Sequence, residues 1–226
     1  MNGAGLPAPL FITLYQIYSL LRYNTTMGTI FDQLHTIISV DIEAAGAIPS
    51  QYALLSIGAC TLTRPQHTFY VELIPDKDNF DIQALQVHGL DIEQLKENGV
   101  APEAAMRRFA DWLNHTLPAG EKPIMLAFNA PFDWMFIHDY FIRYLGDNPF
   151  GHSAIDIKAV YLGATGKSWH ETSGFYLHSR YHDGSKLSHN ALEDAIAQGE
   201  IFEGILREIQ SNLQDFPAYP TTNPSE

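Results

Sequence analysis

The chain has 226 residues, which is the length of one ordinary domain with some additional chain. Hydrophobic residues make up 46% and charged residues 17%, so a core can form and an intrinsically disordered chain is excluded. The formal net charge of −13 argues against binding a long duplex by bulk electrostatics, although divalent cations could still bring a phosphate to an acidic site.

Cys60 is the only cysteine, so an intrachain disulfide and a zinc site built on several cysteines are excluded. It lies in an apolar run, which is typical of a buried thiol. A chain without a disulfide framework fits a cytoplasmic location.

Residues 1–34 are expected to form a loosely ordered extension. The apolar run Leu6–Leu21 is interrupted by polar residues and prolines, so it lacks the roughly 18 clean apolar residues of a spanning helix. Arg22 is the first basic residue and follows this run, whereas a secretory signal carries its basic residues before it. We therefore predict no membrane span. Two readings remain: an upstream start preceding Met27, or a helix that binds a partner or lies on a membrane surface.

Residues 35–210 are predicted to form one α/β domain. Strand-like segments come first, separated by turn residues, and they indicate an antiparallel meander: His35–Asp41, Tyr52–Thr63 and His67–Ile74. Helical segments follow, the first two with acids at their starts and glycines after their ends: Asp81–Val87, Asp91–Glu97 and Ala101–His115.

The second half of the domain alternates between strands and helices. The predicted elements are a buried strand at Pro123–Phe128, a helix from Pro131 to about Tyr144, and a strand running into a short helix at Ile155–Leu162. Residues 163–187 are expected to be a loop, Asn190–Ile209 a long amphipathic helix, and residues 211–226 a flexible tail. The pattern predicts a mixed sheet flanked by helices.

Asp41 and Glu43 lie two residues apart at the end of the first strand, so both side chains point to the same side of it. Neighbouring carboxylates repel each other, and the pKa of each rises unless cations neutralise them. Carboxylate oxygens at such a position suit Mg²⁺ or Mn²⁺. By itself the pair is weak evidence, because acids are common where strands end.

Further acids precede or open two of the predicted helices. Asp133 follows Asn129-Ala-Pro-Phe132 near the start of a helix, where an acid often only complements the helix dipole. His189 and Asp194 lie five residues apart at the start of the last long helix. Their simplest interpretation is an N-terminal histidine and a solvated acid.

Taken in order, these residues resemble the DEDDh class of 3′–5′ exonucleases in the RNase H-like superfamily. The resemblance runs from about Ile37 to Phe202, and three stretches carry it: Val40–Glu43, Ala127–Asp133 and His189–Asp194. The stretch Gln86–Asp91 is similar to the family's linker between two helices. The chain departs from the family at Ala44 and Ala45, where many members have a polar residue, and this concerns contacts to the substrate strand.

The resemblance implies an RNase H-like five-stranded mixed sheet and a metal-dependent exonuclease acting on the 3′ end of single-stranded DNA or RNA. It implies that Asp41, Glu43, Asp133 and Asp194 hold two divalent cations, Mg²⁺ or Mn²⁺, with Asp41 between them. It also implies that His189 takes the proton of the attacking water, for which its ordinary pKa is suitable. The expected products are nucleoside 5′-monophosphates.

The predicted contacts to the substrate are His88, Asn129, Ala44 and Trp169. Basic and aromatic residues gather between residues 158 and 186 of this acidic chain. They could hold a single strand by phosphate contacts and stacking, or they could form a solvated loop whose aromatic rings cover the edge of the core.

Two functions of another class remain as alternatives: a catalytically idle RNase H-like binding module, and an accessory protein of a polymerase. The complete set of mutually repelling carboxylates argues against an idle module. A homodimer and a complex with a polymerase are the partners considered. No residue pattern identifies a reader of the 2′-hydroxyl, so the sequence leaves the choice between DNA and RNA open.

Overall fold

The computed structural model describes residues 29–182 and 189–214. The chain divides into two compact units, residues 1–33 and 34–226. The first described element is the 3-10 helix η1 (Ile30–Thr36). Most of the predicted extension and most of the predicted tail lie outside the described residues, so the domain limits 35 and 210 stay predictions.

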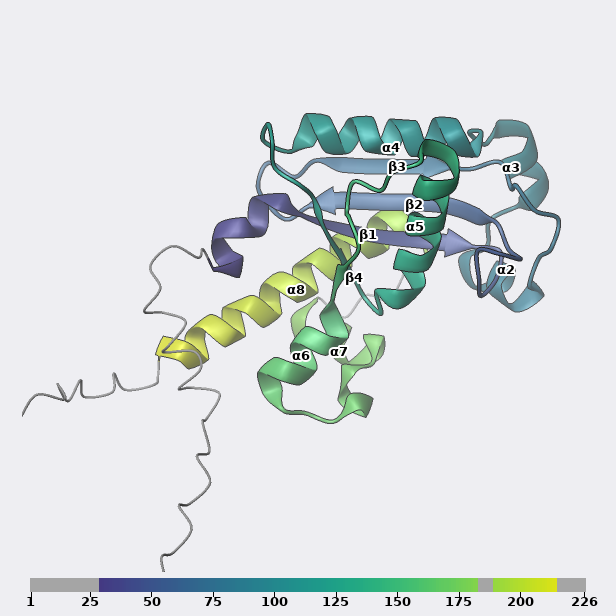
Figure 1. The fold of residues 1–226 in the computed structure, drawn as a ribbon. Coiled ribbons are helices and arrows are strands. Elements are labelled where there is room, and N and C mark those ends of the chain that lie inside the picture. Colours follow the sequence, from purple (N-terminus) through teal and green to yellow (C-terminus); the bar gives the residue numbers. More distant parts are fainter. Residues whose placement is uncertain (1–28, 183–188, 215–226) are drawn as a thin grey trace, which may run out of the picture. The chain divides into compact units, whose positions relative to one another are not determined.

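A five-stranded mixed sheet organises the larger unit (Figure 1), with the strand order β3-β2-β1-β4-β5. The strands are β1 (Ile37–Ala44), β2 (Leu54–Thr61), β3 (Thr68–Glu72), β4 (Ile124–Ala127) and β5 (Ala154–Asp156). The first three strands pair antiparallel, and β4 and β5 continue the sheet parallel to β1. The predicted meander followed by parallel strands is confirmed. β1 continues past its predicted end, so it contains both Asp41 and Glu43.

The predicted helices are present with shifted ends. They are α2 (Ile82–His88), α3 (Ile92–Asn98), α4 (Pro102–Thr116), α5 (Pro131–Leu145), α6 (Ile157–Thr165) and α8 (Ala191–Gln214). The predicted acids do begin the first two helices, because Asp81 accepts from the backbone N–H of Gln83 and Asp91 from that of Glu93, both at 2.8 Å. No helix in the described part of the chain has the length and apolar character needed to cross a membrane.

The prediction of a loop over residues 163–187 was wrong for part of that segment. It contains the 3-10 helix η2 (Trp169–Thr172) and the helix α7 (Gly174–Tyr181). A capping box formed by Ser168 and Glu171 starts η2. Helix α7, in which Leu177 is buried, packs against α8. Lys186, part of the predicted basic stretch, lies outside the described residues.

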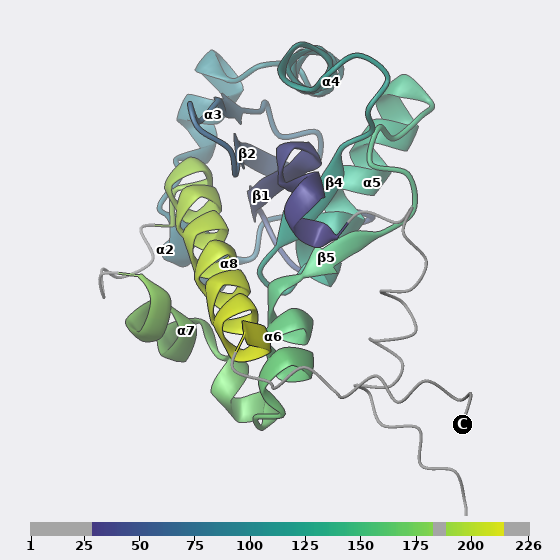
Figure 2. The same cartoon turned by 90° about the vertical axis from the view of Figure 1, so that its left-hand side faces the viewer.

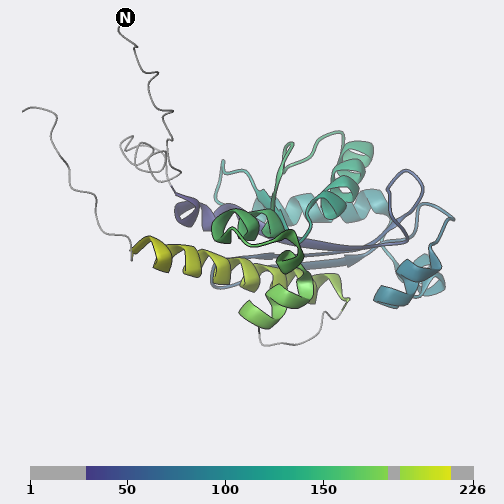
Figure 3. The ribbon, with the colours of Figure 1, turned by 90° about the horizontal axis from the view of Figure 1, so that it is seen from below.

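Helices cover both faces of the sheet, as Figures 2 and 3 show: α4 and α5 lie on one side of the strands and α8 on the other. Alternate residues of β1, among them Val40 and Ile42, belong to the hydrophobic core on the α4–α5 side. Ser39 faces α8, and its hydroxyl donates to the carbonyl of Ala195 at 2.7 Å. Asp41 and Glu43 follow the period of Ser39, so they too lie on the α8 face.

Small side chains on β1 and β2 allow α8 to approach the sheet closely. Cys60 is buried there with its thiol 3.6 Å from the carbonyl oxygen of Ala195, and burial raises the pKa of that thiol to about 12. Gly58 pairs with Asp41 in the register of β1 and β2. A Cβ on Gly58 would lie 2.1 Å from the backbone of Ala191. The first turn of α8 is therefore packed directly beside Asp41.

Candidate active site

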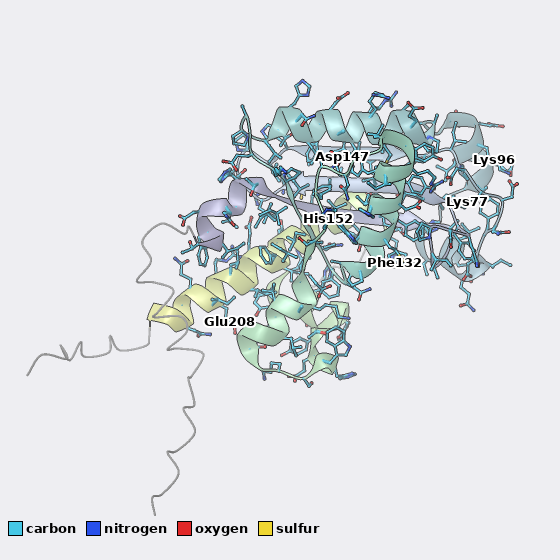
Figure 4. All side chains as sticks on the ribbon, viewed as in Figure 1. Lys77, Lys96, Phe132, Asp147, His152 and Glu208 are labelled. Carbon is cyan, nitrogen blue, oxygen red and sulfur yellow. The ribbon has the colours of Figure 1, made fainter. Side chains whose placement is uncertain are left out.

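Three segments that are distant in sequence meet in one cavity. It has a volume of about 330 Å³ and lies where β1 ends and where α5 and α8 begin. All five residues predicted to be catalytic line it: Asp41, Glu43, Asp133, His189 and Asp194. Phe132 also lines it, and Figure 4 shows this residue at the N-terminal end of α5.

The carboxylates lie close together, and a backbone hydrogen bond holds one of them. The N–H of Ile42 donates to Asp133 Oδ1 at 3.2 Å, which ties the first turn of α5 to β1. Glu43, His189 and Asp194 each offer a ligand atom, and these atoms lie within 4.8 Å of one another. The fold thus brings the acid of the first motif stretch next to the histidine and the acid of the last one.

The electrostatics of the cavity disfavour carboxylates without counter-ions. Burial raises the pKa of Asp41 well above its ordinary value, and the charges of Asp133, Glu43 and Asp194 raise it further. Burial likewise raises the pKa of Asp133, although backbone N–H groups oppose this. Burial, with the charge of Asp194, raises the pKa of Glu43 to about 8. A group of acids that is costly to ionise together is the oxygen-rich, negatively charged environment that divalent cations favour.

His189 and Asn129 both have a left-handed backbone, with φ of 55° and 65°, and they are the non-glycine residues of the described chain that do. Both line the cavity. Such conformations are strained and tend to occur at functional sites. Asn190 supports this geometry, because its side chain caps α8 by accepting from the N–H of Leu192 at 3.1 Å. His189 is therefore placed just before the first turn of the helix that carries Asp194.

The predicted substrate contacts have different positions. Asn129 lines the cavity, but Ala44 is buried in the core on the opposite face of the sheet, so its side chain does not reach the cavity. His88 is half-buried and does not line the cavity. Its Nδ1 accepts a hydrogen bond from the N–H of Leu90, and burial, with the nearby His189, lowers its pKa. Trp169 is 59% exposed and lies under the Lys158 ammonium at 4.3 Å from the ring centre, also outside the lining.

The predicted basic stretch is partly neutralised by acids. Lys167 forms an ion pair with Glu171 at 3.5 Å, and Arg180 forms one with Glu208 at 3.0 Å. These two cations are therefore less available for a phosphate chain than the sequence suggested.

Sequence reasoning missed Gln198 and His178, which line the cavity, and Gly58, which supports it from β2. Gln198 lines the cavity four residues after Asp194, a helical spacing that could have drawn attention to it. His178 lines it from α7 and was overlooked because that segment was predicted to be a loop; burial and the nearby His182 lower its pKa, while Asp194 opposes this. Gly58 matters only through its contact with α8, which no local pattern reveals.

Comparison with known proteins agrees with this geometry. No family model matches the chain. The chain is 41% identical over 165 residues to the 3′–5′ DNA exonuclease Cap18 of Escherichia coli, an alignment that covers 73% of this chain and 88% of that protein.

Solved structures show the same fold at low sequence identity. The nuclease domain of 3′hExo, a DEDDh family member, bound to rAMP matches with a TM-score of 0.63 at 14% identity, over 76% of this chain and 92% of that chain. The cell-death related nuclease 4 (CRN-4) matches with a TM-score of 0.61 at 12% identity, over 76% of this chain and 64% of that chain. With the relationship to Cap18 and the shared RNase H-like fold, the chain belongs to the DEDDh family of 3′–5′ exonucleases.

Proposed function

We propose that this exonuclease removes nucleotides from the 3′ end of single-stranded DNA and releases nucleoside 5′-monophosphates. One observation carries the proposal: four carboxylates and a histidine from three distant segments converge in a single cavity. The preference for DNA rests on the relative Cap18, which is named a DNA exonuclease. RNA remains the competing substrate, since a similar fold occurs in a 3′-exonuclease that recognises a histone mRNA stem-loop.

The site fits divalent cations, because its acids are oxygen ligands whose joint ionisation is opposed by burial and repulsion. In the proposal Asp41, Glu43, Asp133 and Asp194 hold two such ions, Mg²⁺ or Mn²⁺. When bound, the ions supply stabilisation of the charge on the attacking and leaving oxygens of a phosphodiester.

His189 is proposed to act as the general base. An imidazole nitrogen takes a proton from water as its oxygen bonds to phosphorus. The bond from phosphorus to the 3′ oxygen of the preceding nucleotide then breaks, and that oxygen takes up a proton. The released nucleotide keeps the phosphate at its 5′ position, and the strand is left with a 3′-hydroxyl.

Asn129 is the proposed substrate contact with the strongest support, because this residue lines the cavity. Trp169 is proposed to stack on a base further along the strand, since its ring is exposed and Lys158, which lies over it, could contact a phosphate. His88 is retained as a proposed contact next to His189. Any contact from Ala44 would have to come from its backbone.

The decisive experiment is a parallel digestion of matched DNA and RNA single strands, labelled at either end, with Mg²⁺ or Mn²⁺. We expect stepwise shortening from the 3′ end, faster on DNA. Asp41→Ala, Glu43→Ala, Asp133→Ala and Asp194→Ala should each nearly abolish it while the fold is kept. Retention of more than about a tenth of the wild-type turnover by all four variants would refute the proposed metal site.

The same experiment distinguishes an exonuclease from a catalytically idle binding module. An idle binding module would retain the labelled strand without shortening it under any metal. Homodimer formation, association with a polymerase and a cytoplasmic location are further proposals, of which the first is tested by the mass of the purified chain in light scattering.

A further inference from the structure

Gln198 connects the catalytic carboxylates to the turn that follows β4. Its side chain is only 3% exposed and projects from α8 one helical turn after Asp194. Its Nε2 donates to Asp41 Oδ1, and its Oε1 accepts from the backbone N–H of Phe128 at 2.9 Å. One buried amide thus contacts two segments that are 157 and 70 residues away in sequence.

The orientation of this amide is fixed by its partners. The N–H of Phe128 can only donate, so the amide oxygen must face it and the amide nitrogen must face Asp41. Asp41 Oδ1 must then accept that hydrogen bond, which sets the rotation of a carboxylate whose terminal torsion is otherwise broad. Asp41 lines the cavity, and this hydrogen bond leaves its second carboxylate oxygen, Oδ2, available to a cation.

The turn beside Gln198 is held at a second point. The N–H of Ala130 donates to Asp156 Oδ2 at 2.7 Å. Between the two attachments lies Asn129, whose backbone is left-handed. Gln198 and Asp156 together fix the segment that leads from β4 into the first turn of α5 and Asp133.

We propose that Gln198 is a positioning residue, which holds the Asp41 carboxylate in the orientation needed to bind cations. This inference rests on the proposed function, in which Asp41 is a ligand. Burying an amide has a desolvation cost that a methionine of similar size would avoid. A glutamate would place a further carboxylate beside Asp41. Only an amide of this length offers both the donor for Asp41 and the acceptor for Phe128.

The test compares Gln198→Met with Gln210→Met, a change of an exposed glutamine on the same helix. Mn²⁺ binding to the substrate-free protein is measured by electron paramagnetic resonance, and turnover is measured against Mg²⁺ concentration. Removing a hydrogen-bond partner of a metal ligand commonly weakens metal binding by about 10- to 100-fold. We expect a loss of that size for Gln198→Met and less than about a twofold change for Gln210→Met.

A double-mutant cycle asks whether Gln198 acts through Asp41. In an Asp41→Asn background, Gln198→Met should change Mn²⁺ binding by less than about twofold, because the carboxylate it orients is gone. An equal loss in both backgrounds would overturn the inference, and so would wild-type Mn²⁺ binding and turnover in the single variant. If Gln198→Met does not fold, Gln198→Asn replaces it, since this amide is one methylene shorter and can satisfy only one of the two partners.

The outcome is distinguishable from a failure of the proposed function. If the wild-type chain neither binds Mn²⁺ nor shortens a strand, the function itself is wrong. If the wild type does both and Asp41→Asn is impaired while Gln198→Met is not, the metal site stands and only the role of Gln198 is refuted.

Discussion

Replacing Glu43 by glutamine should stabilise the metal-free protein at alkaline pH. Burial and the charge of Asp194 raise the pKa of Glu43 from 4.5 to about 8. Because the pKa in the folded state lies above that of the unfolded chain, the folded state holds more protons between these values. The contribution of Glu43 to the free energy of unfolding is therefore fully present below about pH 4.5 and is lost as the pH rises to about 8. Glu43→Gln removes the charge that causes the loss.

The size of the effect follows from the two pKa values. Each pH unit between them corresponds to about 1.4 kcal/mol, which gives an upper bound of about 5 kcal/mol. Glu43 is partly exposed, so water screens part of this, and we expect about 2–3 kcal/mol. For a domain of this size that corresponds to a rise in Tm of about 4–12 °C at pH 8.5.

The assay is thermal unfolding in the presence of a chelator at pH 5 and pH 8.5, with Glu121→Gln as the matched control on an exposed turn. Glu43→Gln should melt higher than the wild type at pH 8.5 and within about 2 °C of it at pH 5. Added Mg²⁺ should raise the Tm of the wild type more than that of Glu43→Gln. An unchanged or lower Tm of Glu43→Gln at pH 8.5 would mean that the charge of Glu43 does not destabilise the metal-free protein, which would refute the prediction.

Three further results are expected. Gly58→Ala should lower turnover by about 10-fold or more, since its Cβ would displace the backbone of Ala191 at the start of α8. The control Gly163→Ala, whose Cβ would meet no atom within 4 Å, should keep full activity and stabilise α6 by about 0.5–1 kcal/mol. Equal activity of the two variants would contradict the close packing of α8 on β2. His189→Asn should reduce turnover by about 10²–10⁴-fold with little change in Mn²⁺ binding, and near-normal turnover would make the histidine merely positional. A chain that starts at Met27 should keep its specific activity, and inactivity of such a chain in soluble, folded form would show that the missing residues contribute to the site.

The five residues that meet in the cavity could be predicted to lie together because their order along the chain and their positions on strands and helices are local properties. Asp41 and Glu43 alternate on a strand, and His189 and Asp194 flank a helix start, so a linear pattern contains them. Helix α7 was missed because it is short and packs against α8, a tertiary contact that no local pattern encodes. The helical spacing from Asp194 indicates the face of α8 on which Gln198 lies, but no periodicity encodes its hydrogen bond to Asp41, 157 positions away.

The position of Ala44 illustrates the limit of transferring a family pattern. Its neighbour Glu43 faces the cavity, and strand alternation places the next side chain in the core. A contact from the side chain of Ala44 is therefore incompatible with the geometry of the strand, whereas a contact from its backbone stays a prediction.

The close packing of α8 on Gly58, Ser39 and Cys60 has a consequence for when the enzyme becomes active during its synthesis. Asp41, Glu43 and Asp133 leave the ribosome well before His189, which precedes α8, and Asp194, which lies in it. A nascent chain that has not yet added this helix contains three of the acids but no complete catalytic centre. Nuclease activity should therefore appear only after α8 has been synthesised and has packed on the sheet.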